Sequence, residues 1–171
     1  AGIGRDNVPE KEARNRGVII RYPSEETTNI IFNETASFTC SLIFKMFYRN
    51  TGTIDPWVKE SREQLSNKKL LVIGMGEIGT RVARLMNPYL NVSTFDVLQN
   101  KNSDLKIMMG NADCITIHIP KSDENISFID KKKMSWMKDN SIIINTARGA
   151  IVNEKALYDE IKNNRIKAAF D

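Results

Sequence analysis

Short apolar runs alternate with amphipathic segments over the part of the chain that follows Lys69. The apolar runs predict five β-strands, at Leu70–Ile73, Val92–Phe95, Cys114–Ile119, Ser141–Asn145 and Ile166–Phe170. Apolar residues at helical spacing predict helices between them, roughly at Ile78–Asn87, Asp104–Met109, Asp130–Met137 and Glu154–Asn163. Several strands are apolar throughout, as expected where helices cover both faces of a sheet. The alternation predicts an α/β, doubly wound fold with a parallel sheet and right-handed crossovers.

A long helix is predicted before this unit, over about Thr28 to Arg49. It carries two apolar stripes at helical spacing, the first made of Phe32, Ala36, Cys40, Ile43 and Phe47 and the second of Phe38, Leu42 and Met46. A helix that is apolar on two sides needs two partners. One partner is the sheet of the same domain. We expect the other to be a second subunit, which predicts a homodimer through the helix at about 28–49.

The first residues of the chain are less regular. Residues 1–8 have the composition of coil, and Pro9–Arg14 has a proline and acidic residues where a short helix would begin. Gly17 is placed to end that helix. Val18–Arg21 is predicted as a short strand, and Asn50–Gln64 as a polar connector with glycine and proline.

Composition narrows the class of protein. A chain of 171 residues suits one domain, or one domain with part of another. The formal net charge of +4 is spread along the chain, and its densest run, Lys131–Lys133, is typical of a solvated helix face. No nucleic-acid motif accompanies it, so we predict no nucleic-acid partner.

The two cysteines indicate the compartment. Cys40 and Cys114 each stand alone in apolar runs, which is typical of buried free thiols in a reducing environment. No secretory signal opens the sequence and no apolar run is long enough to cross a bilayer, so we expect a cytoplasmic protein without a membrane partner. We predict no metal site.

A glycine motif at the end of the first predicted strand gives the strongest functional signal. Leu70–Ile73 leads into Gly74-x-Gly76-x-x-Gly79, a helical pattern follows, and Asp96 stands 22 residues after the first glycine. Gly74 permits a tight turn, Gly76 lets the backbone approach a pyrophosphate, and Gly79 lets the helix and strand pack closely. Three glycines alone also occur in ordinary turns, but with the strand, the helix and the acid they predict a Rossmann-type dinucleotide site.

Asp96 bears on which dinucleotide binds. A carboxylate at this place accepts hydrogen bonds from the adenosine ribose hydroxyls and repels a 2′-phosphate. No arginine stands near it in the sequence, and the nearest cation is Lys101. We therefore predict NAD as the cofactor in preference to NADP.

Further candidates follow from the rule that ligands bind at the carboxyl ends of the strands in such sheets. His118, next to Pro120, suits either a general acid or base, or a side chain that shapes the cofactor pocket, and the lack of a visible partner favours the second. Arg148 follows an apolar strand, so it is either a loop residue at the surface or a fork for a substrate carboxylate. Asp171 is either a loop residue or a partner for the nicotinamide carboxamide.

Taken in order, the motifs resemble the D-isomer-specific 2-hydroxyacid dehydrogenases. The resemblance covers nearly the whole chain. It rests on Ala1–Val8, Asn33-Glu34, Arg49, Trp57, Gly74–Gly79 with Asp96, Ala112–Pro120, Asn145–Glu154 and Ala168–Asp171. The Asn145-Thr146-Ala147-Arg148-Gly149 stretch matches the signature of the family closely.

The resemblance implies roles for these residues. Gly76, Glu77 and Ile78 would present backbone N–H groups to the pyrophosphate. Thr146 and Ala147 would lie near the nicotinamide, with His118 and Pro120 beside the cofactor. Arg148 would bind the substrate carboxylate and keto oxygen, and Asp171 would hold the carboxamide. The implied reaction is reversible hydride transfer between NAD and a 2-hydroxy acid or the matching 2-keto acid.

The resemblance also implies a division of the chain. Residues 1–24 would be the end of a substrate domain with its hinge, and residues 25–171 the NAD-binding domain. The catalytic glutamate and histidine of the family come after the strand that ends here, so we expect this part alone to lack the complete catalytic machinery. Glu77 is a departure, because an acid close to the pyrophosphate must turn to solvent or reduce affinity.

Two other classes remain open from the sequence. The same family includes transcriptional corepressors, which predicts a non-catalytic, NAD-sensing interaction protein as the alternative. An unrelated Rossmann protein that binds S-adenosylmethionine is disfavoured by the signature around Arg148.

Overall fold

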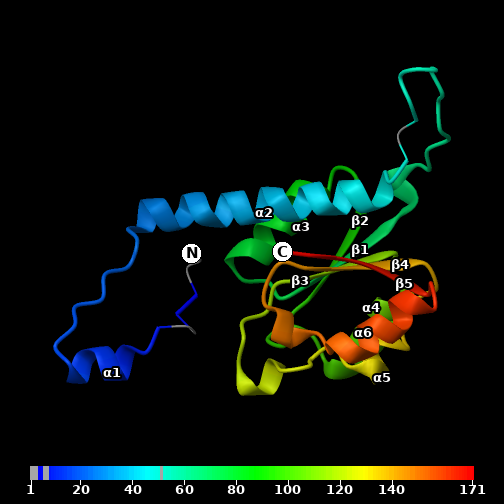
Figure 1. Ribbon diagram of the computed structural model, residues 1–171. Helices are drawn as coiled ribbons and strands as arrows, with labels where there is room; N and C mark the ends of the chain where they lie inside the picture. Colours follow the sequence, from blue (N-terminus) through cyan, green and yellow to red (C-terminus); the bar gives the residue numbers. More distant parts are fainter. Residues whose placement is uncertain (1–3, 6–7, 51) are drawn as a thin grey trace.

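The computed structural model describes residues 4–5, 8–50 and 52–171, and it confirms the predicted Rossmann-type α/β fold. Five parallel strands form one sheet in the order β2-β1-β3-β4-β5 (Figure 1). Their bounds are β1 Lys69–Ile73, β2 Asn91–Phe95, β3 Cys114–Ile117, β4 Ser141–Asn145 and β5 Ile166–Phe170. The order reverses between β1 and β3, which is the switch point at which such sheets bind ligands.

Helices cover both faces of the sheet. One face carries α2 (Glu25–Phe47) and α3 (Glu77–Met86), while the other carries α4 (Asn102–Asn111), α5 (Lys131–Met134) and α6 (Glu154–Lys162), as Figure 1 shows. The predicted helix at Asp130–Met137 is shortened to the single turn of α5. Its N-cap, Asp130, accepts a hydrogen bond from the Lys133 amide at 2.7 Å.

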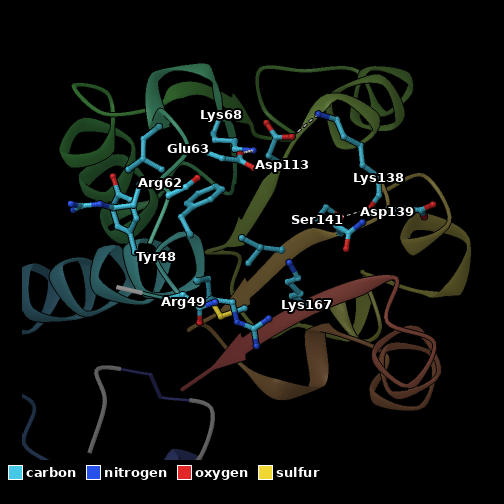
Figure 2. A pocket seen from close by; sticks show the side chains of 17 residues that line it. Tyr48, Arg49, Arg62, Glu63, Lys68, Asp113, Lys138, Asp139, Ser141 and Lys167 are labelled. Carbon is cyan, nitrogen blue, oxygen red and sulfur yellow. Dashed lines mark hydrogen bonds and ion pairs between the residues drawn. The ribbon is translucent and has the colours of Figure 1, made fainter. Parts of the chain in front are cut away.

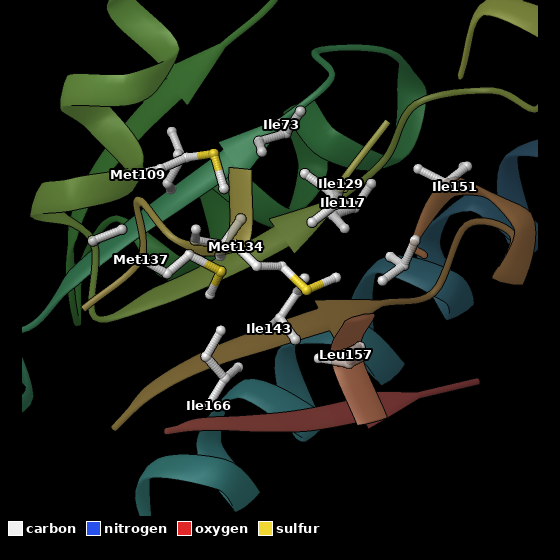
Figure 3. Close-up of a cluster of buried hydrophobic side chains, with 14 of the residues drawn as sticks. Ile73, Met109, Ile117, Ile129, Met134, Met137, Ile143, Ile151, Leu157 and Ile166 are labelled. Carbon is white, nitrogen blue, oxygen red and sulfur yellow. The ribbon is translucent and has the colours of Figure 1, made fainter. Parts of the chain in front are cut away.

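Alternate residues of each strand fill two separate cores. Leu70 and Val72 of β1 pack against α2 and α3, whereas Leu71 and Ile73 pack on the opposite face. Figure 3 shows the second core, where methionines of α4 and α5 meet isoleucines of β3 and β4. Both faces of β1, β3 and β4 are buried, so these strands are mainly apolar, and this is why the sequence pattern located them well. The edge strands β2 and β5 are only partly buried.

The long helix α2 begins earlier than predicted. The Ser24 hydroxyl accepts a hydrogen bond from the Thr27 amide at 3.2 Å and caps the helix. Ala36, Cys40 and Ile43 are buried against the sheet as the first stripe predicted. Of the second stripe, Phe38 keeps 44% of its surface exposed.

One prediction for the first residues is wrong. Helix α1 (Glu10–Asn15) ends before Gly17, which has a φ of +68°, as predicted. Val18–Arg21, however, is not a strand. Val18 and Ile19 keep 58% and 81% of their surface exposed, and the segment pairs with no strand among the described residues. Extended apolar residues form a strand only when a neighbour supplies backbone partners. Part of the coil predicted at 1–8 lies outside the described residues.

Two further segments differ in detail from the prediction. Strand β3 ends at Ile117 instead of Ile119, so His118 and Pro120 belong to the following loop. The connector after α2 forms a small loop closed by an antiparallel bridge between Thr53 and Val58, and it projects from the body of the domain (Figure 1). The predicted boundary between two domains near residue 24 stays a prediction.

The β1–α3 turn leaves no room for a side chain at two of its glycines. A Cβ on Gly79 would lie 1.9 Å from the Gly74 carbonyl oxygen, and a Cβ on Gly74 would lie 2.7 Å from the His118 carbonyl oxygen. Gly74 also has a φ of +93°. By contrast, a Cβ on Gly76 would meet nothing within 4 Å.

These distances predict different effects on stability for two alanine substitutions. Gly79→Ala places a methyl group against backbone and should lower the free energy of unfolding by about 2–3 kcal/mol. Gly76→Ala, the matched control, points into open space and should change it by less than about 0.5 kcal/mol. Urea denaturation of both variants measures the difference. Equal stability of the two variants would contradict the close packing described here.

Candidate functional site

The predicted site residues meet at one edge of the sheet. In the strand register, Ile73 of β1 lies opposite Phe95 of β2 and Ile117 of β3. Asn145 of β4 lies opposite Ile117 and also opposite Phe170 of β5. The strands therefore end together, and the loops that follow them carry Gly74–Gly79, Asp96, His118, Thr146–Arg148 and Asp171 to a common edge.

The glycine loop leaves the start of α3 open to an anion. Gly76 is the N-cap of the helix and no side chain caps it. The first N–H groups of a helix lack partners within the helix, and the helix dipole is positive there. Gly76 is exposed and a Cβ on it would meet open space, so the backbone itself forms the surface. This arrangement fits a pyrophosphate bound by backbone amides.

Glu77 turns away from this anion position. Its carboxylate pairs with Arg81 one turn further along α3. Arg81 also donates to Asn33 Oδ1 at 2.9 Å and to Asn29 Oδ1 at 3.1 Å, and its guanidinium lies over the Phe32 ring. The acid at the helix start is therefore neutralised by a cation that also ties α3 to α2.

Asp96 follows β2 and is held as a carboxylate by backbone donors. Its Oδ1 accepts from the Leu98 amide at 2.9 Å, and its Oδ2 accepts from the Met75 amide at 2.8 Å. These two hydrogen bonds lower the pKa of the Asp96 carboxyl group below its ordinary value. Each oxygen keeps a lone pair for a further donor. The acid is thus ionised, oriented and joined directly to the glycine loop.

His118 packs behind the glycine loop. Its Cβ would lie 3.3 Å from a Cβ on Gly79, and its Nε2 lies 2.9 Å from the Thr116 hydroxyl. Burial lowers the pKa of the imidazole to about 4, so the ring is neutral near pH 7. This environment agrees with a role in shaping the pocket and disfavours a general acid or base near neutral pH. Pro120 follows in an exposed loop, where its carbonyl accepts from the Asn125 side-chain amide at 2.8 Å.

The loop after β4 is shaped by a side chain to which the sequence analysis gave no role. Asn145 is buried, and its amide group donates to the Arg148 carbonyl at 2.8 Å while its Oδ1 accepts from the Ala147 amide at 3.0 Å. The two bonds hold the backbone around Thr146, Ala147 and Arg148 in a fixed turn. The asparagine at the end of the predicted strand is the sequence feature that could have indicated this role, because asparagine side chains often bind the backbone of a following turn.

Arg148 is half-buried and stands as the N-cap of a short 3-10 helix, η3 (Gly149–Ile151). Its guanidinium donates to the Ala147 carbonyl at 2.8 Å, so the side chain lies along its own loop. Asp171 is exposed beyond β5, and its amide donates to the Asn145 carbonyl at 3.3 Å. Both residues therefore lie beside the Asn145 turn.

A second unpredicted contact joins α2 to this loop. The Thr146 and Thr39 hydroxyl oxygens lie 2.8 Å apart, and both side chains are buried. Thr39 falls between the residues of the predicted apolar stripe. Periodicity alone gave no reason to place a threonine there.

A large cleft lies at the opposite, amino edge of the sheet. It has a volume of about 870 Å³ and is lined by residues of both signs (Figure 2). Asp113 accepts from Lys138 Nζ at 2.8 Å and from the Lys69 amide at 2.8 Å, and Lys68 pairs with Glu63. Most of this charge is paired locally. The cleft is remote from the glycine loop and is not the predicted site.

The described part of the chain shows no metal site and no membrane-spanning helix, and its thiols are buried. No group of histidine, cysteine or acidic residues there is arranged to hold a metal ion. Cys40 and Cys114 are free and buried, as predicted, and burial raises the pKa of the Cys40 thiol to about 11. None of the described helices combines the length and apolar character needed to span a membrane.

Comparisons with known proteins agree with this geometry. Residues 47–171 match the family model described as D-isomer specific 2-hydroxyacid dehydrogenase, NAD binding domain. The D-3-phosphoglycerate dehydrogenase of Archaeoglobus fulgidus is 32% identical, over 99% of this chain and 34% of that protein. The hydroxypyruvate reductase of Thermotoga maritima is 28% identical, over 99% of this chain and 58% of that protein.

A solved structure supports the fold. The D-lactate dehydrogenase of Aquifex aeolicus, in complex with NAD and lactic acid, superposes with a TM-score of 0.81 at 24% identity. The match covers 99% of this chain and 55% of that one. The chain thus spans between a third and three fifths of the length of these relatives.

The buried imidazole predicts a pH dependence of stability. The unfolded chain takes up the His118 proton near pH 6.5, and the folded chain only near pH 4. The unfolded state therefore binds more protons between these values, and stability falls as the pH drops from 6.5 to 4. We expect a loss of about 1–2 kcal/mol between pH 7 and pH 5 that is absent in His118→Gln. Denaturation curves at both pH values measure it, and an equal loss in the variant would contradict the assignment.

Proposed function

The chain belongs to the D-isomer specific 2-hydroxyacid dehydrogenases, and we propose that it is the cofactor-binding part of an enzyme that transfers hydride between NAD and a 2-hydroxy or 2-keto acid. The observation that carries the proposal is the carboxyl edge of the sheet. There an uncapped helix start, an ionised Asp96 and the Arg148 loop lie at the ends of adjacent strands. When bound, NAD supplies the hydride acceptor and its reduced form the donor.

The residues of the edge suit different parts of NAD. Backbone amides at Gly76, Glu77 and Ile78 would hold the pyrophosphate. Asp96 would accept hydrogen bonds from the adenosine ribose, because its two oxygens keep lone pairs after binding Met75 and Leu98. With the adenosine over β2 and the pyrophosphate over β1, the nicotinamide half would reach the loops that follow β3 and β4.

The loops after β3, β4 and β5 would surround that second half. His118 and Pro120 would line the pocket, Thr146 and Ala147 would lie beside the nicotinamide, and Asp171 would bind the carboxamide. These roles follow the family signature and the position of each residue at the edge.

Arg148 is the residue proposed to act on the substrate. Its guanidinium presents several N–H donors in a plane, which suits a substrate carboxylate, and its charge would polarise the adjacent keto oxygen. Asn145 fixes the backbone from which this side chain extends.

Cofactor preference provides the test of the proposal. We expect the chain to bind NADH more tightly than NADPH, because the ionised Asp96 would repel a 2′-phosphate. Asp96→Asn keeps one of the two oxygens that accept from the Met75 and Leu98 amides and removes the charge, and it should reduce the NADH preference by about tenfold. Isothermal titration of both dinucleotides measures the ratio. Lys101→Ala, which changes a neighbouring cation, is the control. Tighter binding of NADPH by the unchanged chain would refute the proposal.

We further infer a homodimer formed through α2. Support comes from the outer side of that helix, where Ile30 and Phe38 keep 57% and 44% of their surface exposed. Apolar residues exposed on one helix are typical of a surface that another protein subunit covers. The two unlinked thiols, Cys40 and Cys114, favour a reducing, cytoplasmic location.

A charge on the outer side of α2 should separate the subunits. We expect Phe38→Glu to convert a dimer to a monomer, because a carboxylate cannot be buried without a partner. Ile107→Glu is the matched control, since Ile107 is 66% exposed on α4 on the other face of the sheet. Sedimentation velocity distinguishes the two species. A monomeric unchanged chain, or a dimer that persists in Phe38→Glu, would refute the interface.

A further inference from the structure

The contact between Thr39 and Thr146 joins the long helix to the edge proposed to bind the nicotinamide. Thr39 is fully buried in the middle of α2, and Thr146 follows β4 with 9% of its surface exposed. Their hydroxyl oxygens are 2.8 Å apart across 107 residues of sequence. By comparison, the Thr35 and Ser41 hydroxyls of α2 donate to the Ile31 and Phe38 carbonyls of the same helix.

The direction of this hydrogen bond follows from a third group. The Thr39 hydroxyl also lies 2.8 Å from the Thr35 carbonyl oxygen. A carbonyl only accepts, and a hydroxyl has one proton, so the Thr39 proton goes to Thr35. Thr146 must then donate its own proton to Thr39. The lone pairs of the Thr146 oxygen are left as acceptors.

We propose that Thr39 is a positioning residue of the dinucleotide site, which fixes the Thr146 rotamer and hydroxyl proton so that the Thr146–Arg148 loop is rigid toward the nicotinamide half of NAD. The proposal rests on the proposed function for the identity of the ligand. Thr39 is fully buried, so the proposed role is exerted through Thr146 and not by contact with the cofactor.

The loop is then held from two sides. Asn145 binds the backbone at Ala147 and Arg148, but neither of its hydrogen bonds involves the Thr146 side chain. The hydroxyl of Thr39 supplies that missing restraint. Valine has nearly the same shape as threonine, so packing alone does not require a hydroxyl at this buried place.

The distinguishing experiment compares two ligands. Thr39→Val removes the hydroxyl with little change of volume, and Thr39→Ser keeps it. We expect Thr39→Val to weaken NADH binding by about three- to tenfold, the range of one net hydrogen bond, and Thr39→Ser to change it less than about twofold. ADP-ribose lacks the nicotinamide, so its affinity should stay the same in both variants. Isothermal titration of both ligands into the unchanged 171-residue chain and into each variant measures all six affinities.

A second measurement needs no ligand. The Ala147 amide is bonded to Asn145, so its hydrogen exchange reports how often the loop opens. We expect Thr39→Val to speed this exchange several-fold relative to Gly110, a distant glycine of α4, while Thr39→Ser does not.

The outcomes separate the two proposals. Equal weakening of NADH and ADP-ribose, or unchanged NADH affinity in Thr39→Val, would overturn the positioning role. So would Ala147 exchange that is unchanged in that variant. If the unchanged chain binds ADP-ribose but not NADH, the proposed function fails at the nicotinamide half, whereas the exchange measurement still decides whether Thr39 holds the loop.

Discussion

The fold depends on the absence of side chains where β1 turns into α3. Gly79 lies so close to the Gly74 carbonyl that a single methyl group would separate strand and helix. The same place receives His118 from the end of β3, so three elements meet at a point with no spare volume. Helix α3 then sets the position of Arg81, which binds α2. Through this cation the two glycines help to place the longest helix, together with the apolar packing of Ala36, Cys40 and Ile43 against the sheet.

Where the sequence predicted the structure well, the reason is burial on both faces. Strands such as β1 and β4 read as unbroken apolar runs, and the glycine motif located the turn between β1 and α3. The pattern failed at Val18–Arg21, because apolar residues predict a strand whether or not a neighbouring strand exists. It also missed Thr39 and Asn145. Their hydrogen-bond partners are fixed by three-dimensional position, in the case of Thr39 by a residue 107 positions away, and periodicity carries no such information.

Helix α2 does more than cover the sheet. Its inner side packs Ala36, Cys40 and Ile43 on β1, β3 and β4, its first turns bind Arg81, and its middle reaches the loop after β4 through Thr39. The outer side is the proposed subunit contact. A displacement of this helix would change the positions of the start of α3 and of Thr146 together, which are the places proposed to hold the pyrophosphate and the nicotinamide of NAD.

The two edges of the sheet differ in the residues that form them. At the amino edge, Asp113 links Lys138 to the start of β1, and strand positions are secured by charged side chains. At the carboxyl edge, backbone amides and glycines form the surface together with the ligand-facing candidates Asp96, Arg148 and Asp171. Residues that secure the strands are thus separate from residues that meet the ligand. Because of this separation, substitutions in the loops at the carboxyl edge can change ligand recognition while the charged residues that hold the strands at the amino edge stay unchanged.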